Sequence, residues 1–239
     1  MTADDLLLGA AVLLGASVQR LTGIGFALVA APVLALLVGP AQGVLVANCA
    51  SGAVSALGLC EGWRRVRTAS MVPLVLAAAC TVPAGAWVAD RLPRNVLLTA
   101  VGTAVAAAVL LVACGVRVAA LRGRGGAVAA GAAGGFLNAS AGVGGPALSL
   151  YAVNARWPMR EFVPNAQFYG VLVNLSSVAV KGLPRLPAPV WLLLAAGVGG
   201  GALAGRLLGD RIPERRARQL VLGLALAGAL AVLAKGLLG

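Results

Sequence analysis

The chain has 239 residues, of which 60% are hydrophobic and 11% are charged. Because soluble domains carry about 25% charged residues, this composition excludes an ordinary soluble protein and predicts an all-α integral membrane protein. The net charge of +12 would suggest nucleic acid in a soluble protein. Here the arginines fall in short loops between apolar segments, as in cytoplasmic loops of membrane proteins, so we expect no nucleic-acid partner.

Eight apolar segments follow one another, at residues 6–38, 41–59, 69–89 (interrupted by Pro83), 95–116, 127–153, 160–180, 190–208 and 217–238. The first is preceded by two aspartates and no basic region, so we expect it to belong to the mature protein. As one helix it would be about 50 Å long, whereas the hydrocarbon core is about 30 Å thick. We therefore expect a break at its middle, near Gly23 and Gly25, that folds it into a re-entrant hairpin.

The fifth segment contains the stretch 136–151, FLNASAGVGGPALSLY, which is rich in helix-breaking residues. Glycine loosens a helix, and proline removes a backbone donor and clashes with the preceding turn. Within a bilayer such a break is tolerated only where the freed backbone groups are buried in protein or line a wet cavity. The stretch from Gly142 to Pro146 therefore predicts a broken helix beside a path for a small molecule.

The two breaks are copies of one another at a shift of 119 residues, and the turns 90–93 (DRLP) and 210–213 (DRIP) match at a shift of 120. We therefore expect two repeats, residues 1–120 and 121–239. Glycine-interrupted segments at equivalent positions of two halves indicate a transporter binding site. The equivalent pairs are Gln19 and Asn138, Gly23 and Gly142, Gly25 and Gly144, and Asn48 and Gln167.

Loop charge distinguishes two topologies. If all eight segments cross the membrane, each side receives nine basic residues. If the first segment of each half is re-entrant, each half crosses three times, the halves are inverted, and 13 basic residues lie inside against 5 outside. The positive-inside rule favours the inverted arrangement. The outside set is then Arg91, Arg94, Lys181, Arg185 and Lys235.

Arg20 is the one charge placed deep in an apolar segment, where an arginine costs about 2.5–3.5 kcal/mol on insertion scales. Its guanidinium could pair with an anionic substrate, or it could reach the membrane surface or bond carbonyls freed at the helix break. The polar groups Gln19, Thr22, Asn138 and Ser140 could likewise bind a polar solute or satisfy freed backbone groups.

The glycines at the breaks could present backbone N–H groups at helix starts, which favours an anion. The candidate substrate-binding set is Gln19, Arg20, Thr22, Gly23, Gly25, Asn138, Ser140, Gly142, Gly144 and Gly145. Further polar residues follow at Asn48, Asn165, Gln167, Tyr169 and Asn174, of which Asn165 and Gln167 do not share a helical face. Small-residue spacings at Gly131/Gly135 and Gly197/Gly201/Gly205/Gly209 predict close helix packing.

Enzyme signatures are missing from the sequence. It has no histidine, no HExxH or GxSxG motif, and no carboxylate pair within an apolar segment. We therefore expect no catalytic residues, no metal site and no cofactor. The four cysteines, Cys49, Cys60, Cys80 and Cys114, form no CxxC pair, and we expect them to be buried free thiols.

The chain resembles the TauE/SafE sulfite exporter family of membrane permeases along nearly its whole length. The resemblance rests on LTGIGFALVAAP and NASAGVGGPALSLY, on the polar segments after them, and on the paired DRLP and DRIP turns. The first motif departs from the family pattern by carrying Phe26 and only Pro32. The resemblance implies transport of small sulfur-containing or carboxylated anions, such as sulfite, sulfonates or sulfoacetate, across a bacterial inner membrane.

The sequence thus predicts a secondary transporter in the lipid bilayer that moves a small anion by alternating access. It does not determine the oligomeric state, for which a homodimer is one option. The alternative is a non-transporting membrane subunit that anchors or assembles a partner. A pure anchor has no reason to duplicate a polar break, which favours the transporter. No GxxxxGK[ST] motif is present to suggest an ATPase.

Overall fold

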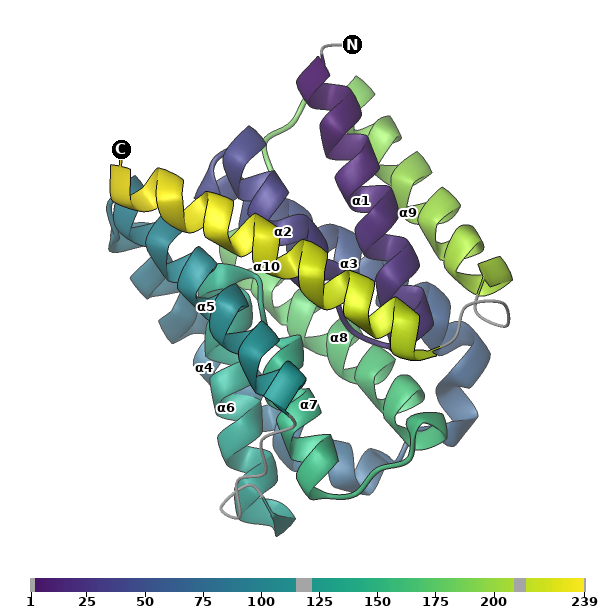
Figure 1. The fold of residues 1–239 in the computed structure, drawn as a ribbon. Coiled ribbons are helices and arrows are strands. Elements are labelled where there is room, and N and C mark those ends of the chain that lie inside the picture. Colours follow the sequence, from purple (N-terminus) through teal and green to yellow (C-terminus); the bar gives the residue numbers. More distant parts are fainter. Residues whose placement is uncertain (1–2, 115–121, 209–213, 239) are drawn as a thin grey trace.

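The computed structural model describes residues 3–114, 122–208 and 214–238, and within these ranges the chain forms helices and no strands (Figure 1). Gly209 and the turn 210–213 lie outside the described residues, as do residues 117–121 of the basic linker 117–126 between the halves. The helices are α1 (Ala3–Thr22), α2 (Phe26–Leu37), α3 (Pro40–Gly62), η1 (Trp63–Arg65), α4 (Thr68–Arg91), α5 (Arg94–Cys114), α6 (Gly123–Ala141), α7 (Gly145–Asn154), α8 (Met159–Lys181), α9 (Ala188–Leu208) and α10 (Glu214–Leu238).

Both predicted breaks are present. Between α1 and α2, Gly23 and Gly25 have φ of 81° and 121°, a left-handed region that glycine enters without strain. Between α6 and α7, Gly142 has φ of 75° and forms the left-handed C-cap of α6. Pro146 then lies in the first turn of α7, where its missing N–H costs nothing.

The helices pack in pairs that combine the two halves of the chain. The most extensive pairs are α4 with α6, α1 with α9, α5 with α10, and α3 with α8. In Figure 1 the α1–α9 pair and the α4–α6 pair lie on opposite sides of the molecule, with α5 and α10 crossing in front. Apolar cores fill both sides, one from α4, α6, α7 and α8 and the other from α1, α2, α3 and α9.

Glycines allow these pairs to approach closely, which confirms the packing role predicted for Gly131, Gly135, Gly197, Gly201 and Gly205. A Cβ on Gly135 would lie 2.1 Å from a carbonyl oxygen of α4, and a Cβ on Gly201 would lie 2.4 Å from one of α1. No side chain fits at either position without moving a helix. The short contact distance therefore depends on glycine at the interface.

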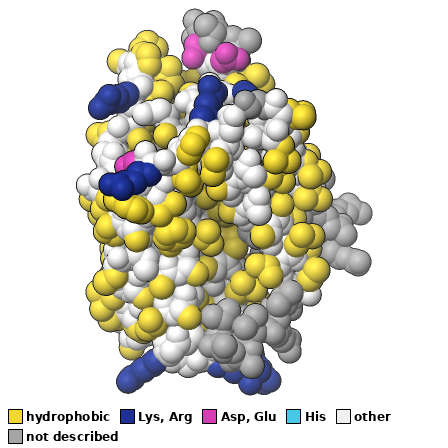
Figure 2. All heavy atoms as spheres, turned by 90° about the vertical axis from the view of Figure 1, so that its left-hand side faces the viewer, with side chains coloured by type: hydrophobic (Ala, Val, Ile, Leu, Met, Phe, Trp, Pro, Cys, Tyr) yellow, Lys and Arg dark blue, Asp and Glu magenta, His cyan; other side chains and the backbone are white. Residues whose placement is uncertain are grey.

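Five helices among the described residues are long and apolar enough to span a membrane: Asp4–Thr22, Pro40–Arg65, Thr68–Arg91, Arg94–Leu111 and Ala188–Leu208. Shorter apolar helices occur at Phe26–Leu37 and Leu226–Leu238. Large apolar side chains such as Leu76 and Leu192 point outward, with 60% and 73% of their surface exposed. On the face drawn in Figure 2, a broad band between the charged groups carries only hydrophobic and uncharged side chains among the coloured atoms.

Polar and charged contacts gather at two ends of the bundle. At the first, here called the Glu61 end, Glu61 pairs with Arg20 and Arg206, and Arg67 pairs with Glu161.

At the second, the Lys181 end, Lys181 donates to the Ala139 carbonyl over 2.9 Å. Nearby, the Arg185 N–H donates to Gln42 Oε1 over 2.9 Å. The loops between helices are thus held at the two ends by charged groups or polar contacts.

Two expectations are wrong. The helix α4 runs unbroken through Pro83, because a proline in a packed membrane helix is tolerated where nearby groups take over the freed backbone bonds. The cysteines are free, but Cys60, Cys80 and Cys114 are exposed and only Cys49 is partly covered. A thiol behaves as a small apolar group, so an outward position in a membrane helix carries little cost.

Candidate functional site

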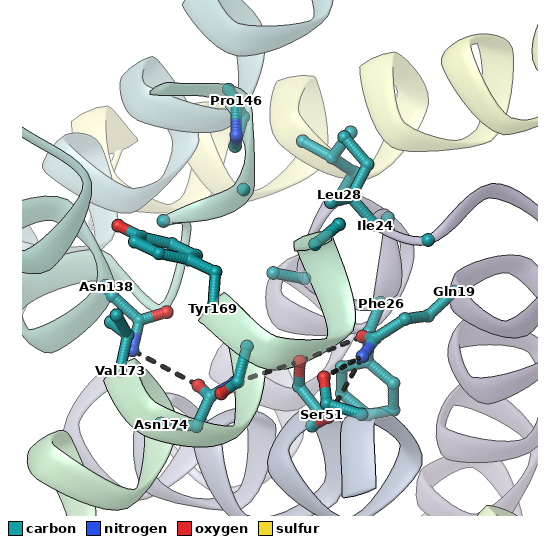
Figure 3. A pocket seen from close by; sticks show the side chains of 18 of the residues that line it. Gln19, Ile24, Phe26, Leu28, Ser51, Asn138, Pro146, Tyr169, Val173 and Asn174 are labelled. Atoms are coloured by element: carbon teal, nitrogen blue, oxygen red, sulfur yellow. Dashed lines mark hydrogen bonds between the residues drawn. The ribbon is translucent and has the colours of Figure 1, made fainter. Parts of the chain in front are cut away.

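The two helix breaks meet at one cavity inside the bundle (Figure 3). Its walls come from the α1–α2 junction, the α6–α7 junction, α3 and α8. A Cβ on Gly145 would lie 3.4 Å from the Cβ of Ile24, so the two junctions are in near contact. The cavity volume is about 40 Å³. That is room for a few water-sized groups, since one water needs about 10–15 Å³ on this measure.

Two helix N-termini border this cavity. Gly25 is the N-cap of α2, Gly144 is the N-cap of α7, and both line the cavity. The Val29 N–H makes the first bond of α2, to the Gly25 carbonyl, so the three preceding N–H groups have no partner within the helix. Neither N-cap supplies a side-chain bond. A helix N-terminus carries about half a positive charge and binds anions.

A chain of hydrogen bonds connects the two broken helices beneath the cavity. Gln19 on α1 donates through Nε2 to Ser55 Oγ over 2.8 Å and to the Ser51 carbonyl over 2.9 Å. Ser51 Oγ donates back to Gln19 Oε1 over 2.8 Å and accepts from Asn174 Nδ2 at 3.3 Å. Asn138 on α6 donates to Asn174 Oδ1 over 3.1 Å. The chain therefore runs from α1 to α6 through α3 and α8.

These contacts repeat at the shift found in the sequence. Gln19 bonds to Ser55, and adding 119 to each number gives Asn138 and Asn174, which are bonded as well.

The surroundings of the glycines at the two breaks also repeat at the shift of 119 residues. A Cβ on Gly23 would meet Val163 and Ala166 on α8. The equivalent Gly142 faces Val44 and Ala47 on α3, again residues 119 positions apart. The two junctions thus have matching surroundings on opposite partner helices.

Most of the predicted site residues line the cavity. These are Gln19, Gly23, Gly25, Asn138, Gly142, Gly144 and Gly145. Two others satisfy the backbone, as their alternative role predicted: Thr22 Oγ1 donates to the Val18 carbonyl over 2.9 Å, and Ser140 Oγ donates to the Phe136 carbonyl over 2.7 Å.

Arg20 also lies away from the cavity lining. Its guanidinium pairs with Glu61, and its side chain is 12% exposed. A second arginine, Arg206, approaches the other oxygen of Glu61 at 3.5 Å. Arg20 is therefore not the isolated mid-membrane charge that the sequence indicated, because the last turn of α1 brings it to a carboxylate at the end of α3. Among the described residues that line the cavity, none is acidic or basic.

Sequence reasoning missed Ser51 and Ser55, both of which line the cavity. Two signals could have found them. Asn48, Ser51 and Ser55 are spaced three and seven residues apart, which places them on one helical face. Ser55 is also the residue that the 119-residue shift places on Asn174.

Several buried polar atoms in the described part of the chain have no hydrogen-bond partner. They include Asn48 Oδ1, both amide atoms of Gln167, and the Tyr169 hydroxyl. Tyr169 lines the cavity and is 3% exposed. By contrast, Asn165 Oδ1 accepts the Arg67 backbone N–H over 2.9 Å, so Asn165 serves a loop contact. Neither Asn165 nor Gln167 is among the residues that line the cavity.

Comparison with known proteins identifies the family of the chain. A family model described as sulfite exporter TauE/SafE matches residues 7–232. The chain belongs to the TauE/SafE family. No curated protein and no solved structure matched the chain in the corresponding searches. Family membership makes this a membrane protein of a transport family.

Proposed function

We propose that the chain is a secondary transporter for a small sulfur-containing or organic oxyanion in a bacterial inner membrane. The observation that carries this proposal is the pair of uncapped helix N-termini at one cavity lined by uncharged residues. Such N-termini attract negative charge without a cationic side chain, so an anion can be bound and released again. Membership of a sulfite exporter family supports a sulfur oxyanion as the substrate class.

Two inverted repeats, 1–120 and 121–239, would give alternating access to this cavity. Support comes from the pairing of helices, since α1 packs on α9 as α6 packs on α4, and α3 and α5 pack on their own counterparts α8 and α10. The hydrogen bonds and glycine contacts related by 119 residues support the same arrangement. In such carriers the substrate lies where the repeats meet, and one half rocks against the other.

The first segment of each half would enter and leave the membrane on one side. Arg20 at the end of α1 contacts Glu61 at the Glu61 end, whereas Lys235 contacts the last turn of α2 at 3.5 Å, at the Lys181 end. With the Glu61 end in the cytoplasm, this topology has the arginine distribution expected of a bacterial inner-membrane protein.

Uptake by proteoliposomes tests the function. Labelled sulfite, sulfoacetate and acetate would be offered with and without a pH gradient to the wild type and to Asn138→Ala. We expect saturable flux of at least one anion, reduced about tenfold or more in the variant because a hydrogen bond at the cavity wall is lost. Absence of flux for every anion would contradict transport. Unchanged flux in a folded Asn138→Ala protein would place the substrate site elsewhere.

A further inference from the structure

The orientation of the Asn138 amide is fixed by its neighbours. Asn174 Nδ2 donates to the Gly170 carbonyl over 2.8 Å, and a carbonyl accepts only, so Asn174 Oδ1 must face Asn138. Ser177 Oγ gives its hydrogen to the Val173 carbonyl over 2.9 Å and can only accept from Asn138 Nδ2 at 3.0 Å. Both neighbours therefore require the NH₂ group of Asn138. A flipped amide would place oxygen against oxygen on two sides.

The oxygen of Asn138 is consequently turned towards the cavity. Asn138 is 6% exposed and lines the cavity, and no hydrogen bond to its Oδ1 is formed among the described residues. Figure 3 shows the amide nitrogen on the dashed line to Asn174 and the oxygen pointing away from it, beside the Tyr169 ring. A Cβ on Gly144, the N-cap of α7, would lie 3.0 Å from this oxygen. An acceptor thus lies next to the N–H groups that attract an anion.

The equivalent residue of the first half does not present such an acceptor. Gln19 Oε1 accepts from Ser51 Oγ, and Gln19 Nε2 donates to Ser51 and Ser55. Both ends of that amide are therefore occupied within the protein. Among the described residues that line it, the cavity has donors from two helix starts but a free side-chain amide acceptor on the Asn138 side only.

We propose that the cavity takes a singly charged oxyanion that carries one hydrogen-bond donor, an O–H or N–H group. This inference rests on the proposed transport function. The anionic oxygens face the N-termini of α2 and α7, and the donor meets Asn138 Oδ1. An anion that lacks a donor leaves this buried oxygen unsatisfied and places negative charge against it. A second negative charge would meet no cationic side chain among the described residues that line the cavity.

Isosteric anions test the donor requirement. Isethionate and propane-1-sulfonate differ only by a terminal hydroxyl in place of a methyl group, and glycolate and propionate differ in the same way. Uptake of all four into proteoliposomes would be compared for the wild type, with protein-free liposomes to subtract leakage. We expect the hydroxyl member to be favoured about tenfold in kcat/KM within each transported pair, the effect of one hydrogen bond to a buried acceptor.

Two variants locate the acceptor. Asn138→Leu keeps the side-chain size but removes the oxygen, so the preference should vanish or reverse. Gln19→Leu is the matched control at the equivalent position. It should lower flux through the damaged network yet keep the ratio within each pair, because Gln19 offers no free acceptor.

The outcomes separate this inference from transport itself. A wild-type preference for the hydroxyl anions that is lost in Asn138→Leu and kept in Gln19→Leu supports the inference. If the wild type transports sulfite or either pair without preferring the hydroxyl anions, the inference is overturned and the transporter function is left intact. This conclusion holds even if Asn138→Leu fails to fold. A preference that survives in folded Asn138→Leu overturns it as well. No flux of any anion in the wild type removes the proposed function and the inference together.

Discussion

The hydroxyl of Ser51 donates to the amide oxygen of Gln19 over 2.8 Å. The same Ser51 oxygen accepts from Asn174 Nδ2 at 3.3 Å. Ser51 is thereby the link between the hydrogen bonds of the first half and those of the second. Its position on α3 decides whether the two broken helices share one network.

Replacing Ser51 by alanine should separate these networks. Gln19 Oε1 would lose its donor in a buried site, which costs about 1–3 kcal/mol. We expect a lower thermal unfolding midpoint in detergent and reduced anion flux. Ser176→Ala is the control, because Ser176 Oγ bonds only to the Leu172 carbonyl one turn earlier, and it should change neither. An unfolding midpoint for Ser51→Ala equal to that of Ser176→Ala would contradict the role of the link.

Alanine at the two break glycines should have unequal effects. Gly23 and Gly142 have similar φ, 81° and 75°, so alanine costs about 1–2 kcal/mol of strain at each. At Gly23 the new Cβ would also lie 3.2 Å from Val163 Cα, whereas at Gly142 the nearest atom is 3.7 Å away. We expect Gly23→Ala to be the less stable variant in thermal unfolding, and both to lose flux.

Gly182→Ala controls for strain alone. Gly182 has φ of 84° with no atom within 4 Å of the added Cβ, and it lies in a loop away from the cavity. It should lose more stability than Gly142→Ala, because its ψ of −174° lies in a region that is essentially restricted to glycine, whereas the ψ of 11° at Gly142 does not, but it should keep its flux. Equal stability of Gly23→Ala and Gly142→Ala would show that the Val163 contact does not matter.

The α1–α9 interface offers a matched pair of glycines on one helix. A Cβ on Gly201 would lie 2.4 Å from the Leu13 carbonyl oxygen, and a Cβ on Gly199 meets nothing within 4 Å. Gly201→Ala should destabilise the protein by about 1–3 kcal/mol through overpacking. Gly199→Ala should be neutral or stabilise it by about 0.5–1 kcal/mol, since alanine favours the helix. The unfolding midpoints of both variants check this order, and a reversed order would exclude close packing here.

Arg20→Ala should affect stability and spare substrate binding. Arg20 pairs with Glu61 and does not line the cavity, so the expected loss is roughly 1 kcal/mol with an unchanged KM. Glu61→Gln should behave in the same way, because it removes the same pair from the other side. Flux kinetics and thermal unfolding measure both effects. A tenfold rise in KM for Arg20→Ala alone would indicate direct contact with the anion.

Cysteine labelling checks the topology. Single cysteines at positions Arg64, Arg156 and Arg185 would be placed in a protein whose four native cysteines are replaced. The inverted arrangement predicts that the first two react with an impermeant maleimide from the cytoplasmic side and the third from the opposite side. Eight crossings would instead put positions 64 and 185 together and 156 opposite. The labelling pattern in right-side-out and inside-out vesicles therefore decides between them.

Much of the architecture could be predicted because it follows from local chemistry. The glycine and proline runs specify where the helices break, and glycine at position 142 allows the left-handed conformation that ends α6. The small-residue spacing on α9 predicted close contact, and Gly201 makes it. Pro83 was misleading, because its effect on a helix depends on the neighbours that take over the freed backbone bonds.

The site was less predictable because hydrogen-bond partners come from distant segments. Arg20 is an isolated charge along the chain, yet Glu61, 41 residues later, meets it in space. Ser51 and Ser55 are ordinary helix residues until α1 packs close enough for Gln19 to reach them. A polar side chain that could bond to its own helix backbone can instead bond to a group on another helix, when packing brings that group within reach.

The sequence alone determined that the chain is a membrane protein with two related breaks, because composition and backbone preference act residue by residue. Only the tertiary structure decided that both breaks open on one cavity and that Asn138 presents its oxygen there. The physical reason is that a side-chain amide carries a donor NH₂ group on one side and an acceptor oxygen on the other. Which side remains free depends on the carbonyl of Gly170 and the hydroxyl of Ser177, and these are set by helix packing rather than by neighbours in the chain.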